Sequence, residues 1–214
     1  MRADYQLVTD NLLDLSHVTF LHRGILSNGE MPDGESVDIA EDGDALRVTR
    51  RALDVPPSPM FDLMFRNDGM PVDRWSVMRW DAPGVLVHDA GVCPPGEDRD
   101  AGMTVIGTHL LTPSVPGQCL YHIAAVRRRE GESPADRDPA LGEQLSALRR
   151  YAFDEQDRPI LEAQQAAYDR AGGLDQLRPV MLSIDTAPLR ARRILARLIA
   201  EEATAHPQLV GCAS

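Results

Sequence analysis

The sequence predicts an α+β domain in which helices pack on one face of an antiparallel sheet. Three observations lead to this fold class: apolar residues at helical spacing over about residues 7 to 22, a series of short strand-like segments between about residues 36 and 129, and helical patterns in the last third of the chain. Short turns connect successive strand-like segments, and such links favour antiparallel pairing because parallel strands need long crossover connections.

The first predicted helix covers about residues 7 to 22. Thr9 or Asp10 is its candidate N-cap, because short polar side chains at a helix start accept hydrogen bonds from the first free N–H groups. Val18 and Thr19 are β-branched and disfavour helix slightly, so the helix is expected to end or distort near them. Its apolar positions are Leu7, Leu12, Leu13, Leu15 and Phe20.

The middle of the chain predicts a sheet of short strands. Five segments alternate apolar and polar residues or form short apolar runs, and turns rich in glycine or proline separate them. The proline-rich stretch 55–59 is expected to lie outside any interior strand, because proline cannot donate a ladder hydrogen bond. The strand segments are 45–50, 72–78, 85–87, 103–111 and 119–126, with turns at 41–44, 82–84, 94–97 and 115–117.

The last third of the chain predicts three helices, over residues 139–153, 159–171 and 187–205. Gly172 and Gly173 end the second of them, since glycine readily adopts the left-handed conformation that follows many helices. Pro159 cannot lie inside a regular helix without cost, so a helix break is predicted at residues 154–157.

The composition is that of an ordinary globular protein and argues against several classes. The chain has 214 residues, enough for one domain with a sizeable core, and its net charge of −11 argues against a duplex nucleic-acid surface. No apolar run approaches the ~18 residues of a membrane helix. Residues 1–5 lack the apolar core of a signal peptide, so a cytoplasmic location is expected. Cys93, Cys119 and Cys212 are too widely spaced for a disulfide framework or a thiolate metal site on this chain alone.

Residues 11–22 carry the side chains that indicate chemistry. Asn11, Asp14 and His17 recur at steps of three, so on a helix they share one face. His22 lies about 140° around an ideal helix from His17, and both imidazoles reach one metal only if the helix distorts or ends. Two imidazoles and a carboxylate from elsewhere form the three-ligand face that suits non-haem Fe(II) and leaves positions open for dioxygen and substrate. The alternative is that both histidines are hydrogen-bonded residues at a helix end.

Several strings along the chain together point to one enzyme family. Residues 10–22, with the pattern N-x2-D-x2-H-x4-H, resemble the iron-binding helix of Rieske-type aromatic ring oxygenases, in particular the vanillate O-demethylase and dicamba-demethylase branch. The resemblance continues through residues 73–75, 107–113, 157–165 and 192–195, so it covers essentially the whole chain. It implies the catalytic domain of the large subunit, with a helix-grip (START/Bet v1-like) antiparallel sheet, an N-terminal helix and C-terminal helices packed on it.

The resemblance also implies the metal ligands. His17 and His22 match the two imidazole ligands of a mononuclear iron, and Asp157 matches the carboxylate that completes the set. Asp157 is also well placed to be the N-cap of the helix that follows it. Phe153 lies four residues before Asp157, whereas the family usually has a phenylalanine three residues before its aspartate, so Asp154 stays an alternative ligand.

Three further residues take their roles from the same resemblance. Asp14 matches the family residue that bridges the iron-ligand histidine and a cluster-ligand histidine of a neighbouring subunit, in a ring of three chains, and passes electrons between them. A carboxylate there orients an imidazole by accepting its second N–H. Asn11 matches a position that hydrogen-bonds in the same neighbourhood. His109 resembles a histidine that lines the substrate pocket, and the alternative is a hydrogen-bonded core histidine on a strand.

The implied function is an iron-dependent monooxygenase domain that hydroxylates or O-demethylates a small, vanillate-like aromatic acid with O2. Full-length members begin with a Rieske domain whose C-x-H and C-x2-H ligands hold a [2Fe–2S] cluster, whereas this sequence has no C-x-H and a single C-x2-H, Cys119 to His122. Electrons are therefore expected from a Rieske protein and its reductase in trans or from a missing domain. Residues 1–214 are expected to form a single catalytic domain.

Two other functions fit the same residues. The first is a non-catalytic module that binds small aromatic ligands in the apolar cavity of the same fold. The second is a hydrolase that uses the three ligands with zinc and needs neither reductant nor oxygen. The metal content of the chain and its substrate-dependent oxygen uptake distinguish both from an oxygenase.

Overall fold

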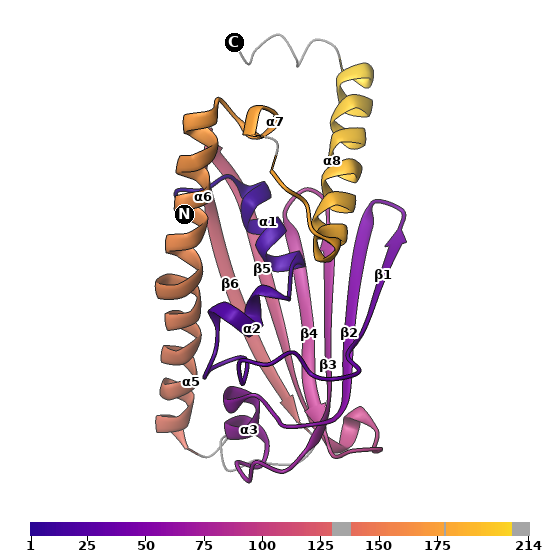
Figure 1. The fold of residues 1–214 in the computed structure, drawn as a ribbon, viewed down its shortest axis with the longest axis vertical. Helices are drawn as coiled ribbons and strands as arrows, with labels where there is room; N and C mark the ends of the chain where they lie inside the picture. Colours follow the sequence, from indigo (N-terminus) through magenta and orange to yellow (C-terminus); the bar gives the residue numbers. More distant parts are fainter. Residues whose placement is uncertain (130–137, 178, 207–214) are drawn as a thin grey trace.

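The computed structural model describes residues 1–129, 138–177 and 179–206, which form one six-stranded sheet with helices on one face (Figure 1). Each strand pairs antiparallel with the next one in the chain, so the sheet is a simple meander. The predicted α+β class and its antiparallel sheet are therefore confirmed. The strands are β1 (Ser36–Asp42), β2 (Ala45–Val55), β3 (Val72–Asp81), β4 (Val85–Cys93), β5 (Met103–Val115) and β6 (Gln118–Arg129).

The helices come before the sheet, within it as one insertion, and after it. α1 and α2 cross the front of the sheet, α5 and α6 stand beside β6, and α3 lies at the opposite end from α8 (Figure 1). Within the described ranges, no helix combines the length and apolar character needed to span a lipid bilayer. The helices are α1 (Tyr5–Leu13), α2 (His17–Leu21), α3 (Pro59–Phe65), α5 (Pro139–Tyr151), α6 (Arg158–Ala171), α7 (Leu174–Leu177) and α8 (Thr186–Ala205), with 3-10 turns η1 (Arg99–Ala101) and η3 (Ser183–Asp185) and a π-helical turn η2 (Ala152–Asp157).

The N-terminal segment is two helices, so the prediction of one helix over residues 7–22 is wrong. α1 is capped by Asp4, whose carboxylate accepts a hydrogen bond from the N–H of Gln6 at 2.9 Å. At Asp14 the backbone leaves the helical region, with ψ of 83°. The Asp14 carboxylate accepts hydrogen bonds from both the N–H and the hydroxyl of Ser16, which stabilises a local turn in place of the next helical turn. The break thus lies before His17 and not between the two histidines.

α5, η2 and α6 form one continuous column along the edge of the sheet (Figure 1). The predicted break at residues 154–157 is a wider turn rather than an interruption, because the N–H of Arg158 donates to the carbonyl of Phe153, five residues earlier. This widening displaces the carbonyl groups that the ring of Pro159 would otherwise meet, so the proline follows without ending the helix.

Two apolar clusters fill the space between the helices and the sheet, and a polar band separates them. The inward-facing residues of β4 show the change: Leu86 belongs to one cluster, Val92 belongs to the other, and His88 lies between them. The neighbouring strands place Arg50, Ser76, Arg74 and His109 in the same band. Cys93 and Cys119 are buried and free, and Cys212 lies outside the described residues.

Candidate metal centre

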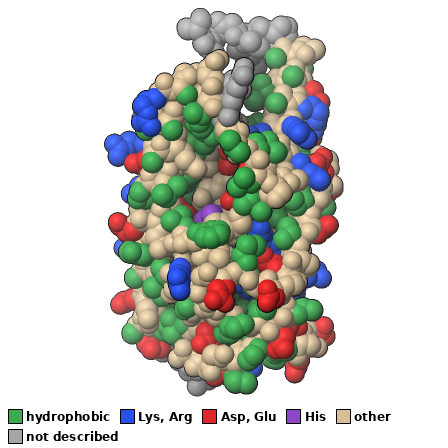
Figure 2. Space-filling model, viewed as in Figure 1, with side chains coloured by type: hydrophobic (Ala, Val, Ile, Leu, Met, Phe, Trp, Pro, Cys, Tyr) green, Lys and Arg blue, Asp and Glu red, His purple; other side chains and the backbone are tan. Residues whose placement is uncertain are grey.

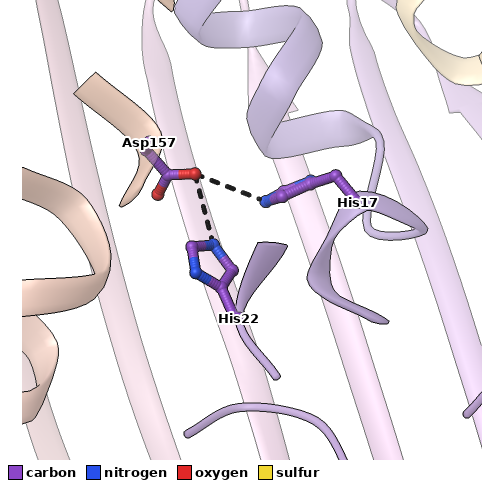
Figure 3. Close-up of side chains that lie close together, drawn as sticks. All are labelled: His17, His22 and Asp157. Carbon is purple, nitrogen blue, oxygen red and sulfur yellow. Dashed lines mark ion pairs between the residues drawn. The ribbon is translucent and has the colours of Figure 1, made fainter. Parts of the chain in front are cut away.

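The structure brings together the three residues that the sequence analysis proposes as metal ligands (Figure 3). The Nε2 atoms of His17 and His22 lie 3.7 Å and 3.2 Å from the same carboxylate oxygen of Asp157. One ligand atom of each residue lies within 4.8 Å of the others. Among the residues that the structure describes, this is the one group of three or more such side chains that could hold a metal ion.

The lengths of α2 and η2 explain why these side chains meet. His17 is the first residue of α2, and His22 is its C-cap, so the helix is over before the second imidazole must point inward. Their ring centroids lie 5.2 Å apart, with an interplanar angle of 74°. Asp157 ends the π-helical turn and is buried, whereas Asp154 lies on the outer side in an ion pair with Arg158. The alternative ligand Asp154 is therefore not part of the group.

Hydrogen bonds orient both imidazoles toward the carboxylate. The Nδ1 of His17 contacts the main-chain carbonyl of Asp14, and the Nδ1 of His22 lies 2.9 Å from Oε1 of Gln156. Because carbonyl oxygens only accept, each Nδ1 carries the proton and each Nε2 keeps its lone pair free for a metal. Asn11 donates from Nδ2 to Oδ1 of Asp157 at 3.4 Å.

Two of these contacts differ from the sequence analysis. Asp14 orients His17 through its main-chain oxygen and not through its carboxylate, because the carboxylate is engaged by Ser16. Gln156 was not predicted as part of the site. Its only signal in the sequence is its position next to Asp157, and nothing local indicates that the π-helical turn directs both residues inward.

The two histidines differ in burial and in proton affinity. His17 keeps 18% of its side-chain surface exposed, whereas His22 keeps 3%. Burial lowers the pKa of His17 below its ordinary value of 6.5, against the opposing effects of the Asp14 carbonyl and Asp157. Burial also acts to lower the pKa of His22, but hydrogen bonds to Asp157 and Gln156 and the charge of Asp157 outweigh it and raise that pKa. A metal therefore competes with a proton chiefly at His22.

The donor set fits a divalent metal with open coordination positions. Neighbouring ligands on an octahedral ion with bonds of about 2.1 Å are about 3 Å apart, close to the 3.2 Å and 3.7 Å found here. Two imidazoles and one carboxylate on a single face are the set that suits non-haem Fe(II). The residues present thus match the predicted ion.

The exposed edge of His17 faces a groove of about 360 Å³ between α1, α6 and α8. Asn11 and Asp14 line this groove beside it, and the exposed apolar side chains of Val180 and Met181 form part of its rim. Figure 2 shows a histidine at the bottom of a hollow on this face of the molecule. The groove is therefore the route by which the metal group is reached from outside.

His109 lies on β5, inside the fold and beside the metal group. It lines a cavity of about 110 Å³, so it lies where the resemblance predicts a pocket residue. It is also hydrogen-bonded, as the alternative predicts, because its Nδ1 lies 2.8 Å from the hydroxyl of Tyr121. Burial, followed by the proximity of His88, lowers the pKa of His109 to about 4, so the imidazole is neutral at pH 7. Its ring also packs against Phe153, with centroids 5.9 Å apart.

Comparison with protein families gives a match over nearly the whole chain. The family described as the vanillate O-demethylase oxygenase C-terminal domain matches residues 1–201. The chain belongs to this family. Other members and related structures agree in fold with the arrangement described above.

The relatives of this oxygenase C-terminal domain are longer proteins. The oxygenase component of chloroacetanilide N-alkylformylase from Rhizorhabdus wittichii is 33% identical over 208 residues, which are 97% of this chain and 57% of that protein. Dicamba monooxygenase bound to 3,6-dichlorosalicylic acid superposes with a TM-score of 0.81 at 25% identity, over 95% of this chain and 58% of that one. Dicamba monooxygenase with non-haem iron and dicamba gives 0.71 at 26% identity, over 96% and 56%. The chain thus spans less than two thirds of the proteins it matches.

Proposed function

We propose that residues 1–214 form the catalytic domain of an iron-dependent monooxygenase that hydroxylates or O-demethylates a small aromatic acid with O2. The observation that carries this proposal is the convergence of His17, His22 and Asp157 beside interior cavities, in a chain of the vanillate O-demethylase family. A solved relative described with non-haem iron and dicamba supports the choice of metal and of substrate class.

The chain's own residues hold the site and shape it. Fe(II) bound there would supply the activation of dioxygen, which no side chain can perform. The Asp14 carbonyl and Gln156 fix the two imidazole rings, so the three ligands are arranged before a metal arrives. His109 offers its neutral imidazole to an oxygen of the substrate, and Phe153 contacts the ring. The buried walls exclude water and hold the substrate carbon near the metal.

Electrons enter from the groove side. Asp14 and His17 both line the groove, so a carrier that occupies it comes within reach of the metal group through Asp14. The carrier is a [2Fe–2S] Rieske centre outside these residues, reduced by a ferredoxin-type reductase. We propose that the Rieske centre of a neighbouring subunit fills the groove in a cytoplasmic homotrimer, as the family resemblance implies.

The experiment begins with metal binding. The chain is purified without oxygen, supplied with Fe(II), and analysed for bound iron; we expect about one iron per chain in the wild type. Asp157→Asn removes an anionic ligand and is expected to abolish stoichiometric binding. Asp154→Asn is the matched control, because it changes the same residue type three positions earlier on the outer side. That variant is expected to retain its iron.

Oxygen uptake then tests the reaction. With a Rieske ferredoxin, its reductase and an aromatic methyl ether acid, the iron-loaded wild type is expected to consume O2 only when the substrate is present. Iron retained by the Asp157 variant, or no substrate-dependent uptake by the loaded wild type, contradicts the proposal. Aromatic binding without iron would instead indicate the non-catalytic module, and ester or amide hydrolysis with zinc would indicate the hydrolase.

A further inference from the structure

A second cavity, of about 110 Å³, lies on the inner side of α2 and is lined by charged side chains. Val18 and Thr19, between the two candidate histidine ligands, form part of its wall, so it adjoins the metal group. None of the side chains that line it is exposed to solvent. It shares Leu26, Phe61 and two residues of β4 with the cavity of His109, so the two spaces are neighbours.

The charges in this cavity do not balance. Arg50 on β2 donates from Nη1 to one oxygen of Glu35 at 3.1 Å, and Arg74 on β3 donates from Nη2 to the other at 2.8 Å. Two guanidinium groups therefore share one carboxylate, which leaves one positive charge in excess. The side chains of Glu35 and Arg50 are only 8% and 12% exposed, so water neutralises this charge poorly.

The remaining ionisable group in the wall does not alter this balance. His88 is the only other ionisable side chain among the described residues that line the cavity. Its Nε2 lies 2.7 Å from the hydroxyl of Ser76. Burial lowers the pKa of His88 to about 4, so it carries no charge at pH 7. The excess positive charge thus belongs to the arginine pair.

Two hydrogen-bond donors in the same wall have no partner. Within the described part of the chain, Nε of Arg50 and Oγ of Ser58 are the buried side-chain nitrogen and oxygen atoms that make no hydrogen bond. Ser58 is 1% exposed and occupies the N-cap position of α3, yet its hydroxyl does not cap that helix. An unpaired buried donor costs free energy of the order of 1–3 kcal/mol, which a ligand that accepts its hydrogen bond recovers.

We infer that this cavity binds the anionic group of the substrate, a carboxylate or sulfonate, through Nε of Arg50 and the hydroxyl of Ser58. The inference rests on the proposed function and specifies it: the substrate is a monoanionic aromatic acid whose charged end lies between β2 and α3. Leu26 and Phe61, shared by both cavities, then contact the ring, and the far end of the ring lies toward His109.

Binding of small probes tests this inference without turnover. Benzoate and benzenesulfonate are the charged probes, and benzamide is the uncharged analogue of benzoate. Calorimetry on the full chain, with and without Fe(II), gives the ratio of benzoate to benzamide affinity. We expect the wild type to prefer benzoate by at least about tenfold, which corresponds to 1.4 kcal/mol. A wild-type ratio near one overturns the inference.

Two pairs of variants separate the donor from the charge. Arg50→Gln and Arg74→Gln both leave one arginine paired with Glu35, but only the first removes the unpartnered Nε. We expect the preference for benzoate to disappear in Arg50→Gln and to persist at least in part in Arg74→Gln. Ser58→Ala is expected to weaken benzoate binding several-fold. Glu35→Gln is expected to strengthen it, an outcome that misfolding cannot produce.

The outcomes distinguish this inference from the oxygenase proposal. Equal ratios in the wild type, Arg50→Gln and Glu35→Gln overturn the anion site even if oxygen uptake is normal. A benzoate complex in which the probe lies elsewhere and only water fills the cavity overturns it too. If the ratios change as expected but the chain neither retains iron nor consumes O2, the anion site stands and the oxygenase proposal fails.

Discussion

The two sides of α2 differ in access and in chemistry. The outer side is a groove of about 360 Å³ with exposed apolar residues on its rim, and it shows the edge of His17 together with Asn11 and Asp14. The inner side is a cavity of about 110 Å³ whose wall holds Arg50 and its ion-pair partners. A protein partner can enter only the first, and a small molecule fits the second. A five-residue helix therefore separates electron supply from substrate recognition, and variants on one side should spare the other.

The strongest effect is expected on the groove side. Asp14→Asn keeps the main-chain carbonyl that holds His17 but removes the carboxylate proposed to pass electrons. We expect substrate-dependent oxygen uptake to fall by about 10–100-fold, the range found when groups that support metal ligands are changed. Iron content and benzoate affinity should stay at wild-type values. The measurements are oxygen consumption with a Rieske donor, iron analysis and calorimetry.

Ser16→Ala is the matched control for Asp14. It removes the hydroxyl that donates to the Asp14 carboxylate but leaves the carboxylate in place. If the carboxylate only stabilises the turn between α1 and α2, both variants lose activity to a similar extent. Such a result, or a loss of benzoate affinity in Asp14→Asn, would remove the distinction between the two sides.

An intermediate effect is expected from acid on the inner side. The pKa of His109 is about 4 in the folded chain and about 6.5 in the unfolded chain, so the unfolded state binds more protons as the pH falls. The stability that this histidine contributes is complete above pH 6.5 and is lost toward pH 4. At pH 5 the loss is about 2 kcal/mol, measurable by urea unfolding of the metal-free chain.

His109→Gln should reduce this acid-dependent loss, because glutamine does not titrate. The exposed His206 provides the control, and His206→Gln should lose stability between pH 7.5 and pH 5 as the wild type does. An unchanged acid response in His109→Gln would show that the interior tolerates a charged imidazole there.

The smallest effect is expected on substrate binding by His109. In His109→Gln, loss of one well-placed hydrogen bond should weaken benzoate binding by about tenfold, or 1.4 kcal/mol, without changing iron content. Tyr121→Phe keeps the imidazole and removes only its internal partner, so its effect should be smaller. A larger effect in the tyrosine variant would mean that His109 serves packing rather than recognition. Titration of both variants by calorimetry decides this.

The sequence predicted the fold where apolar alternation and turn formers coincide. The predicted strand at 45–50 begins where β2 begins, and the segment 119–126 lies inside β6. β1 was not predicted as an individual strand, because it is the edge strand and its side chains are mostly exposed, which leaves no apolar alternation to detect. α3 escaped prediction because its seven residues are too few to show a helical period.

The site divides in the same way. His17 and His22 are close in sequence within a specific pattern, so local reasoning found them together with a distant carboxylate. Arg50, Ser58 and Glu35 come from three segments that only the strand register and the loop before β1 bring to one cavity. No spacing in the sequence encodes that meeting, and the same holds for Gln156.

The π-helical turn has a consequence for how this chain can vary. A turn of this kind holds one residue more than an α-helical turn, so deletion of any one residue from 152–157 would restore a regular helix. Everything after the deletion would then rotate by about 100° relative to everything before it. The helical column would survive, but Asp157 and the packed face of α6 could not both keep their directions. Insertions and deletions should therefore be tolerated in the hairpins and selected against here, and a gap at this place in a homologue would mark a chain that keeps the fold but has lost its carboxylate ligand.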